Sequence, residues 1–411
     1  MGFWSGRNIL LGISGGIAAY KALELIRRLR QEEARVTVVT TANALRFVTP
    51  LCLEALSGGP VHSDLFSLEE ERQMGHIRLA REAELVILAP ATADLLSRMA
   101  CGRADELLTA LLLARQGPIL AAPAMNHAMW SHPATQANVA RLKEWGVAFV
   151  GPESGPLACG EEGEGRLATP ENILEAARRR LTPKPLSGKR LLITAGPTRE
   201  ALDPVRYLSN HSSGRMGWAT ALGALRLGAE VTLVHGPVAL EPPPGARCVA
   251  VESARQMAEA TLQAWPDHDA AILTAAVGDF RPQSAAETKI KKIPGHETWN
   301  LELVQNPDIL AELTRRRRPG QVVAGFAAET GPESLSLARE KLQRKGCDWL
   351  AVNDVAEPGS GFGVATNRLT LLFQDGREEP WPLLSKEEAG ERLARTAAAW
   401  LSGGRPEASA S

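Results

Sequence analysis

The sequence predicts an α/β protein of two domains in series, each with helices on both faces of a mainly parallel β-sheet. Three observations predict this class. Short apolar runs alternate with amphipathic stretches at the spacing of strand–helix–strand units. The alternation stops near residue 182 and then starts again. The 411 residues, 44% of them hydrophobic, suffice for two separate cores of ordinary domain size.

The first half of the chain reads as one parallel sheet. A helix is expected at residues 17–30, because Ala22, Ile26 and Leu29 fall on one face at helical spacing. In such sheets, ligands bind at the carboxyl ends of the strands, so the loops that follow the strands are where a site is expected. The strands themselves are expected at residues 9–13, 36–40, 85–89 and 119–122.

A linker with two prolines, a serine and a glycine is expected at residues 182–188 (TPKPLSG). Beyond it the pattern restarts, with a helix at 218–227. We therefore expect two Rossmann-like three-layer domains, residues 1–183 and 189–401, and a small, polar, disordered tail at 402–411. The strands of the second domain are expected at residues 190–195, 230–234, 271–274, 322–326 and 349–352.

Charge and cysteine usage exclude several classes of protein. Lys and Arg total 46 and Asp and Glu total 47, so no basic excess is available to bind nucleic acid or a membrane surface. No apolar run is long enough to span a bilayer, and no secretory signal is visible. The five cysteines are scattered without a CxxC pair, which indicates reduced thiols in a cytoplasmic protein rather than a disulfide framework or a zinc site.

Three strand-end loops of the first domain carry polar groups. The turn Ser14-Gly15-Gly16 permits close approach of a phosphate to a helix N-terminus, although it is not GxGxxG and a plain βα turn would look the same. Thr92 follows the third expected strand. Asn126 follows the fourth, in a loop where an active-site role is the better interpretation. For its neighbours Met125, Met129 and Trp130, a core position is the more common outcome.

Residues 151–168 contain five glycines and form a long connection, which predicts a mobile lid. Cys159 near its middle is a candidate reactive thiol, since a structural cysteine would normally lie in a core element. His76 is harder to interpret, because a lone histidine is more often structural than catalytic.

These motifs together resemble the flavin-containing cysteine decarboxylases, specifically the phosphopantothenoylcysteine decarboxylases. The resemblance is carried, in order, by GISGGIAAYK (12–21), GHI (75–77), APATA (89–93), PAMNHAMW (123–130) and ACG (158–160), and PxMNxxMW is a specific signature. It implies a flavodoxin-like flavoprotein domain in which FMN supplies the redox chemistry. It also implies FMN contacts from Ser14, Gly15, Gly16, Thr40, Ala89 and Thr92.

The same resemblance implies the catalytic residues of decarboxylation. His76 is the active-site histidine, Asn126 binds the substrate carboxylate and Cys159 on the lid donates a proton. One stretch departs from the family, because Ala-Asp-Glu at 104–106 stands where such decarboxylases usually have Ala-Asn-Asp. The role of that position is left open.

Residues 194–217 (TAGPTREALDPVRYLSNHSSGRMG) are the most informative part of the second domain. Glycines, Ser212 and Ser213, and the cations Arg206 and Arg215 form a set that suits phosphate groups. Asp279 follows the expected strand at 271–274, where it could bind a sugar, a base edge or a metal. Elsewhere, Lys341 and Lys345 share one helix face, whereas Lys291 and Lys292 are interpreted as a solvated charge run.

The second domain resembles the CTP-dependent phosphopantothenate–cysteine ligases of bacteria, with GPTRE, DPVRYLSNHSSGxMG, KIKK, NPDI and GFAAET in order. The resemblance implies that Asn210 contacts an acyl-cytidylate intermediate and that Lys289 assists one of the two chemical steps. Mg²⁺ is inferred from the triphosphate, not from a ligand motif. The implied CTP contacts are Ala275, Asp279, Lys289, Pro307, Asp308, Ile309, Leu310, Phe326, Lys341 and Lys345.

The two resemblances imply a bifunctional enzyme of coenzyme A biosynthesis that acts on 4′-phosphopantothenate, cysteine and CTP. One alternative is that only one half is active. A nicotinamide dehydrogenase is disfavoured by the missing GxGxxG, and a non-catalytic binding protein would have no need of His76, Cys159 and Lys289. The family further implies trimers of the first domain and dimers of the second, which combine into a dodecamer.

Overall fold

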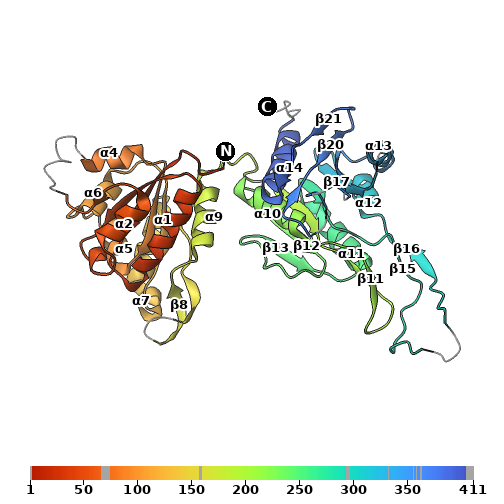
Figure 1. The fold of residues 1–411 in the computed structure, drawn as a ribbon, viewed down its shortest axis with the longest axis horizontal. Coiled ribbons are helices and arrows are strands. Elements are labelled where there is room, and N and C mark those ends of the chain that lie inside the picture. Colours follow the sequence, from red (N-terminus) through yellow and green to blue (C-terminus); the bar gives the residue numbers. More distant parts are fainter. Residues whose placement is uncertain are drawn as a thin grey trace. The chain divides into compact units, whose positions relative to one another are not determined.

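The computed structural model describes residues 2–65, 75–156, 160–292, 297–331, 333–354, 356–357, 359–361 and 363–403. The chain forms two compact units, Met1–Thr182 and Pro183–Ser411, which divide inside the proline-containing segment expected as a linker (Figure 1). Each unit is described by itself.

The first unit is built on a six-stranded, all-parallel sheet with the order β3-β2-β1-β4-β5-β6. Without the two-residue edge strand β3, this order is that of flavodoxin, and the order in which the strands are added to the sheet reverses between β1 and β4. A crevice for a ligand therefore opens beyond the carboxyl ends of β1 and β4. The strands are β1 (Asn8–Ile13), β2 (Arg35–Thr40), β3 (Val61–His62), β4 (Leu85–Ala91), β5 (Ile119–Pro123) and β6 (Ala148–Phe149).

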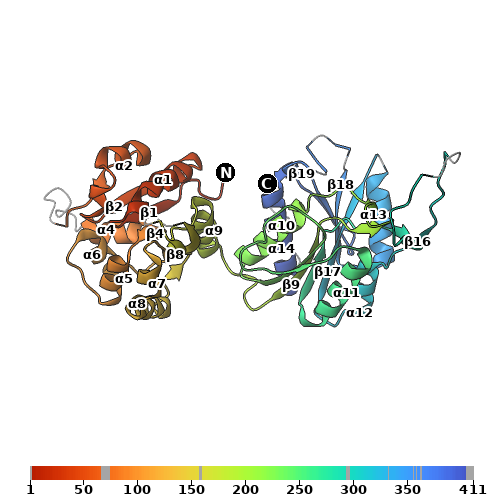
Figure 2. The same ribbon diagram turned by 90° about the horizontal axis from the view of Figure 1, so that it is seen from below.

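Helices cover both faces of this sheet (Figures 1 and 2). On one face α1 (Lys21–Gln31), α2 (Pro50–Ser57) and α9 (Pro170–Leu181) bury an apolar cluster that includes Ile26 and Leu29. The predicted helix face is thus confirmed, although its first turn, Ile17–Tyr20, is a 3-10 helix. The other face carries α4 (Gly75–Glu82), α5 (Ala93–Ala100), α6 (Leu107–Ala114) and α8 (Pro133–Glu144), while the short α7 (His127–Ser131) follows β5.

The glycine-rich segment 151–168 forms an antiparallel hairpin, β7 (Glu153–Pro156) and β8 (Glu162–Arg166), where the sequence predicted a long lid connection. Its glycines allow it to lie on the loop after β5. A Cβ on Gly165 would come within 2.2 Å of the Met125 carbonyl oxygen, and one on Gly163 within 2.8 Å of the His127 Cβ. Cys159 lies outside the described residues.

The second unit has an eight-stranded sheet in the order β13-β12-β9-β14-β17-β18-β20-β21, parallel up to β18 and antiparallel beyond it. The order in which its strands are added to the sheet reverses between β9 and β14. The strands are β9 (Arg190–Ala195), β12 (Glu230–His235), β13 (Arg247–Ala250), β14 (Ala270–Leu273), β17 (Val322–Glu329), β18 (Trp349–Asp354), β20 (Thr370–Phe373) and β21 (Glu378–Pro380).

Helices α10 (Arg215–Arg226) and α14 (Lys386–Leu401) pack closely together on one face, because Gly223 and Gly390 leave no room for a side chain between them. The other face carries α11 (Ala254–Ala264), α12 (Ile309–Arg316) and α13 (Ser334–Lys345). Short two-stranded ribbons complete the unit, namely β10 (Arg199–Ala201) with β11 (Tyr207–Ser209), β15 (Phe280–Pro282) with β16 (Leu303–Gln305), and β19 (Thr366–Asn367) with β22 (Leu384–Ser385).

The predicted fold class is confirmed. Every strand expected from the sequence is present, with bounds that differ from the expected ones by at most three residues. Of the expected tail, the structure describes only Ser402 and Gly403.

Candidate functional sites

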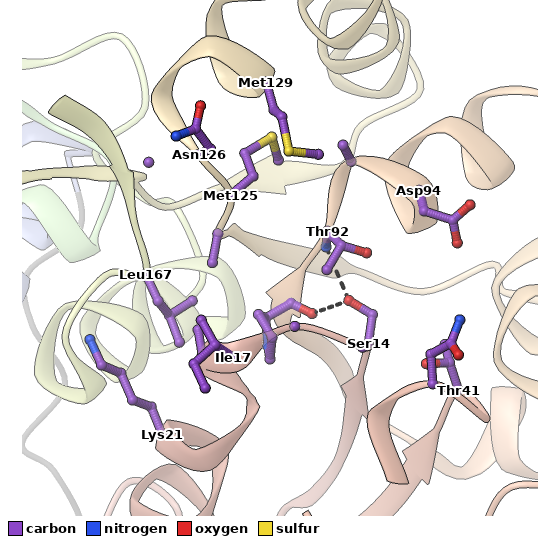
Figure 3. A pocket seen from close by; sticks show the side chains of 18 of the residues that line it. Ser14, Ile17, Lys21, Thr41, Thr92, Asp94, Met125, Asn126, Met129 and Leu167 are labelled. Atoms are coloured by element: carbon purple, nitrogen blue, oxygen red, sulfur yellow. Dashed lines mark hydrogen bonds between the residues drawn. The ribbon is translucent and has the colours of Figure 1, made fainter. Parts of the chain in front are cut away.

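A cavity of about 870 Å³ lies beyond the carboxyl ends of β1, β4 and β5 in the first unit (Figure 3). It is formed by the turn after β1, the start of α5, the loop after β5 and the end of the β7–β8 hairpin. Its described lining includes Ser14, Gly15, Gly16, Ile17, Tyr20, Lys21, Thr41, Asn43, Thr92, Asp94, Arg98, Glu106, Met125, Asn126, Met129, Arg166 and Leu167.

Ser14 ties the turn after β1 to the end of β4. Its buried hydroxyl donates to the Pro90 carbonyl oxygen at 2.7 Å and accepts from the Thr92 N–H at 3.0 Å (Figure 3). The hydroxyl therefore holds the two loops together. Next to it, a Cβ on Gly15 would lie 2.5 Å from the Cβ of Asn43, so only glycine fits this approach of two loops.

Two expected cofactor contacts are not at the cavity wall. Thr40 and Ala89 are buried inside β2 and β4, and the neighbouring Thr41 and Pro90 line the cavity instead. Thr40 is the last residue of β2, whereas Thr41 follows the strand end, where the cavity opens. The Thr40 hydroxyl is buried without a hydrogen-bond partner.

Asn126 is held in a fixed orientation at the cavity. Its Oδ1 caps α7 by accepting from the Ala128 N–H at 2.8 Å, and its Nδ2 donates to Glu161 Oε2 at 2.7 Å. The same carboxylate oxygen lies 3.3 Å from Nδ1 of His127. Glu161, which precedes β8, thus connects the hairpin to the loop after β5, and sequence reasoning missed it.

The core interpretation is wrong for Met129 only, because Met125 packs, partly buried, against the core while it also lines the cavity. Met125 and Met129 both line the cavity, and Met129 is 50% exposed. Trp130 does pack, partly buried, against the core. His76 lies in the first turn of α4 and is not among the residues that line the cavity of its own chain.

An acidic cluster lies at one end of the cavity. Arg98 forms ion pairs with Asp94 at 3.0 Å, Asp105 at 3.3 Å and Glu106 at 3.4 Å. Burial raises the pKa of Glu106, which caps α6. Asp105 and Glu106 belong to the stretch that departs from the family pattern, and the structure shows that both are bound by one guanidinium.

The second unit has a cavity of about 630 Å³ beyond the carboxyl ends of β14 and β17. Nine of the expected nucleotide contacts line it together. They are Ala275, Asp279, Pro307, Asp308, Ile309, Leu310, Phe326, Lys341 and Lys345.

The loop after β14 is positioned by side chains from three other segments. The Gly278 N–H donates to the Thr198 hydroxyl at 3.0 Å, and Asn306 Nδ2 donates to the Gly278 carbonyl at 2.8 Å. Asn210 Nδ2 donates to the Val277 carbonyl at 3.0 Å. Asn210 does not line the cavity itself, but this bond attaches it to the cavity wall.

Cations dominate the α13 side of this cavity. Lys341, Arg344 and Lys345 line it, and Lys345 forms an ion pair with Asp308. Burial lowers the pKa of Lys345, while the charge of Asp279 raises it. Arg344 was not predicted, although it stands three residues after Lys341 and so shares a helix face with that lysine. The set suits a polyanionic ligand.

Two expected features of the second domain are placed differently. Lys289 is exposed and is not among the residues that line the cavity. Arg206, expected to face a phosphate, is bound to Asp203 at 2.6 Å. Among the described residues, no group of three His, Cys, Asp or Glu side chains could hold a metal ion. No helix in the same ranges is long and apolar enough to cross a membrane.

The fold and the two cavities define a two-domain α/β protein with one ligand cavity at the switch point of each sheet. Residues 4–182 match the family model described as Flavoprotein, and residues 186–401 match that of the DNA/pantothenate metabolism flavoprotein C-terminal domain. The first unit is accordingly a flavoprotein domain.

Known proteins resemble the whole chain. It is 47% identical over 382 residues to the coenzyme A biosynthesis bifunctional protein CoaBC of Vibrio vulnificus (strain CMCP6), which covers 93% of this chain and 95% of that protein. It is 45% identical over 397 residues to CoaBC of Bacillus subtilis (strain 168), covering 96% and 97%. The chain therefore belongs to the family of bifunctional coenzyme A biosynthesis enzymes, with a decarboxylase half and a ligase half.

Solved structures match the halves separately. The C-terminal domain of a CoaBC protein is 40% identical, with a TM-score of 0.46, and covers 54% of this chain and 99% of its own. The FMN binding protein AtHal3 is 33% identical, with a TM-score of 0.38, and covers 42% of this chain and 95% of its own.

Proposed function

We propose that the second unit joins cysteine to 4′-phosphopantothenate with CTP, and that the first unit then decarboxylates the product with FMN as cofactor. The observation that supports this assignment most directly is that the cavities of the two units have different linings. One is rimmed by cations from α13 and suits a nucleotide triphosphate. The other presents the fixed amide of Asn126 beneath a hairpin and suits a small carboxylate next to a flat ring.

The residues of the first cavity fit FMN. Its volume of about 870 Å³ lies within the range of small-molecule and cofactor sites. The turn Ser14-Gly15-Gly16 precedes the helical segment Ile17–Tyr20, and Thr92 caps the N-terminus of α5, so two helix starts line the cavity, which suits the phosphate. When bound, FMN supplies the redox chemistry that lets the cysteine carboxylate leave as CO₂.

The protein's own groups bind and protonate the substrate. Asn126 Nδ2 is directed by the bond between Oδ1 and the Ala128 N–H, and we infer that it holds the substrate carboxylate. Cys159, which stands between β7 and β8 in the sequence, donates a proton to carbon after CO₂ leaves. His76 does not face the cavity of its own chain, so we propose that it completes the site of a neighbouring subunit.

In the second unit the chemical problem is an unreactive carboxylate. Attack on the α-phosphate of CTP gives an acyl-cytidylate and pyrophosphate, and the amine of cysteine then displaces CMP. Lys341, Arg344 and Lys345 offset the charge on the phosphates, and Lys289 assists the reacting groups. Mg²⁺ would be held mainly by phosphate oxygens, and Asp279 in the cavity lining offers a carboxylate. Substrate phosphates together with one or two carboxylates are the usual ligands of this ion.

The assembly and location belong to the same proposal. Ile17 and Tyr20 on the rim of the first cavity are 60% and 56% exposed, which supports a subunit contact there. We propose trimers through the first unit and dimers through the second, giving a cytoplasmic dodecamer. Light scattering of the purified protein measures the mass, and a monomer would contradict this part of the proposal.

Separation of the two activities by mutation tests the assignment. Asn210→Ala or Lys289→Ala should abolish ligation and leave decarboxylation of supplied 4′-phosphopantothenoylcysteine intact. Cys159→Ser should do the reverse. A folded variant that lost both activities at once would show that the two sites are wrongly assigned.

A further inference from the structure

Asp203 is a heavily hydrogen-bonded carboxylate of the second unit that the proposed chemistry does not use. It is 4% exposed and lies in the turn between β10 and β11. Its Oδ1 accepts from the N–H groups of Val205 and Arg206, both at 2.8 Å, and its Oδ2 accepts from the Arg206 side chain at 3.0 and 2.6 Å. Burial would raise the pKa of Asp203, but these donors hold it well below its usual range.

Asp203 and Arg206 also form hydrogen bonds to Ile290, in a segment distant in sequence. Asp203 Oδ2 accepts from the Ile290 N–H at 3.1 Å, and Arg206 Nη2 donates to the Ile290 carbonyl at 2.6 Å. Ile290 lies 87 positions further along the chain than Asp203. A third bond, from the Ala286 N–H to the Leu202 carbonyl at 2.9 Å, runs alongside.

The neighbouring elements keep this arrangement in place. Strand β10 lies beside β15, the strand that leads into the segment. Arg206 also lies 5.9 Å from the ring centre of Trp299, which follows later in the same connection. Both backbone groups of Ile290 are thus fixed by charged partners, and bonds to charged groups are the stronger kind.

We propose that Asp203 and Arg206 are positioning residues for Lys289, the residue directly before Ile290. The inference depends on the role of Lys289 proposed above. Adjacent Cα atoms are about 3.8 Å apart, so fixing Ile290 fixes the point from which the Lys289 side chain reaches. Lys289 is exposed and outside the cavity lining, so the anchored backbone determines whether its ammonium can meet the reacting phosphate and carboxylate.

A purely local role would be to stabilise the turn at 203–206. The two bonds to Ile290 contribute nothing to that turn, which already receives two backbone donors. A positioning role and a local role therefore predict different behaviour when Lys289 is removed.

Asp203→Asn keeps the size of the side chain but removes its charge and one pair of acceptor sites. We expect kcat of ligation to fall about tenfold to a hundredfold, since misplacing a reacting group by about 1 Å can cost that much. KM for CTP should change much less, because the cavity lining is untouched. Decarboxylation by the same chain should stay at the wild-type rate.

Asp375→Asn is the matched control. Asp375 likewise accepts from a backbone N–H of its own turn, at 3.1 Å, and from an arginine side chain, at 2.9 Å, both of Arg377. It lies between β20 and β21, away from Ile290 in sequence and contacts. We expect it to leave ligation within about twofold of wild type, as surface charge pairs contribute little.

A double-mutant cycle with Lys289→Gln, which keeps a hydrogen-bonding side chain and is expected to retain a slow ligation rate measurable at high enzyme concentration, decides the proposal. If Asp203 acts through Lys289, Asp203→Asn should cause no further loss of ligation in the Lys289→Gln background. Equal losses in both backgrounds, or a single Asp203→Asn variant with wild-type ligation, would overturn it. Wild-type ligation by Lys289→Gln alone would instead refute the role of Lys289 on which the inference depends.

Thermal unfolding shows whether each variant is folded. Should Asp203→Asn unfold the second unit, Arg206→Met replaces it in the cycle, because it removes the bond to the Ile290 carbonyl and leaves Asp203 bonded to the Val205 and Ile290 N–H groups. Faster amide hydrogen exchange across residues 286–290 is expected in either variant, and unchanged exchange there would contradict the anchor.

Discussion

Replacing Gly165 with alanine should separate the hairpin from the decarboxylation site without disturbing the flavin. A Cβ at this position would lie 2.2 Å from the Met125 carbonyl oxygen and 3.3 Å from the His127 N–H nitrogen. Carbon and oxygen atoms in contact need well over 3 Å, so the hairpin must withdraw by about 1 Å from a backbone that cannot yield.

That withdrawal acts on the proposed chemistry through two bonds. The Met125 N–H donates to the Gly165 carbonyl at 3.0 Å, and Asn126 donates to Glu161 at 2.7 Å. Both hold the hairpin on the loop that carries Asn126. A shift of about 1 Å should lower kcat of decarboxylation by about tenfold to a hundredfold.

The assay follows conversion of supplied 4′-phosphopantothenoylcysteine, with the flavin absorbance and the ligation rate measured on the same preparation. Both of these should match wild type. Gly59→Ala is the control, since a Cβ there meets nothing within 4 Å. Wild-type decarboxylation by Gly165→Ala would refute the contact between hairpin and loop as a requirement of the reaction.

Three further predictions follow from the second unit. Lys345→Met should raise KM for CTP about tenfold or more, as expected for a lost charge-assisted contact. Lys291→Met is the control and should leave KM for CTP nearly unchanged. Similar KM values for both variants would contradict the cavity assignment. Gly390→Ala should destabilise the second unit by about 1–3 kcal/mol in denaturant titration, because a Cβ would lie 2.4 Å from the Ala219 carbonyl carbon, and an unchanged midpoint would refute that packing. Burial lowers the pKa of His268 from its ordinary 6.5, so the unfolded state binds the proton more readily than the folded state. The free energy of unfolding should therefore be highest above pH 6.5 and fall as the pH drops below it. Thermal unfolding between pH 7.5 and 5.5 checks this, and His268→Asn should lose part of the pH dependence.

The sequence was sufficient for the parts of the site that follow directly from strands and helical spacing. Asp279 and the residues 307–310 come just after buried strands or at a helix start, and the ends of parallel strands converge. Lys341 and Lys345 share a face at i,i+4, so both reach the same cavity. Periodicity places these residues on the expected elements, whereas their assignment to the nucleotide came from the resemblance to the ligases.

Contacts between distant segments could not be predicted in this way. The bond from Asn126 to Glu161 and the anchoring of Ile290 by Asp203 join residues that no local pattern connects. The hairpin at 153–166 was missed because its glycines resemble those of a flexible loop, whereas here they allow close packing on Met125. Contacts of this kind, between segments distant in sequence, depend on the tertiary fold.

The position of residues at the strand ends was the other source of error. Thr40 was expected at the cofactor, but it is buried as the last residue of β2, and Thr41, the first residue after the strand, lines the cavity. Met129 was interpreted as core, yet it is half-exposed on the cavity wall. Apolar residues near a flat ligand look the same in sequence as residues of a core.

The most direct test of the two-site account is a single reaction with the purified protein. Its visible spectrum is recorded first, and 4′-phosphopantothenate, cysteine, CTP and Mg²⁺ are then added and the products identified by mass. The account predicts a flavin spectrum and the formation of 4′-phosphopantetheine, CMP, pyrophosphate and CO₂. A colourless protein that forms none of these products would contradict it.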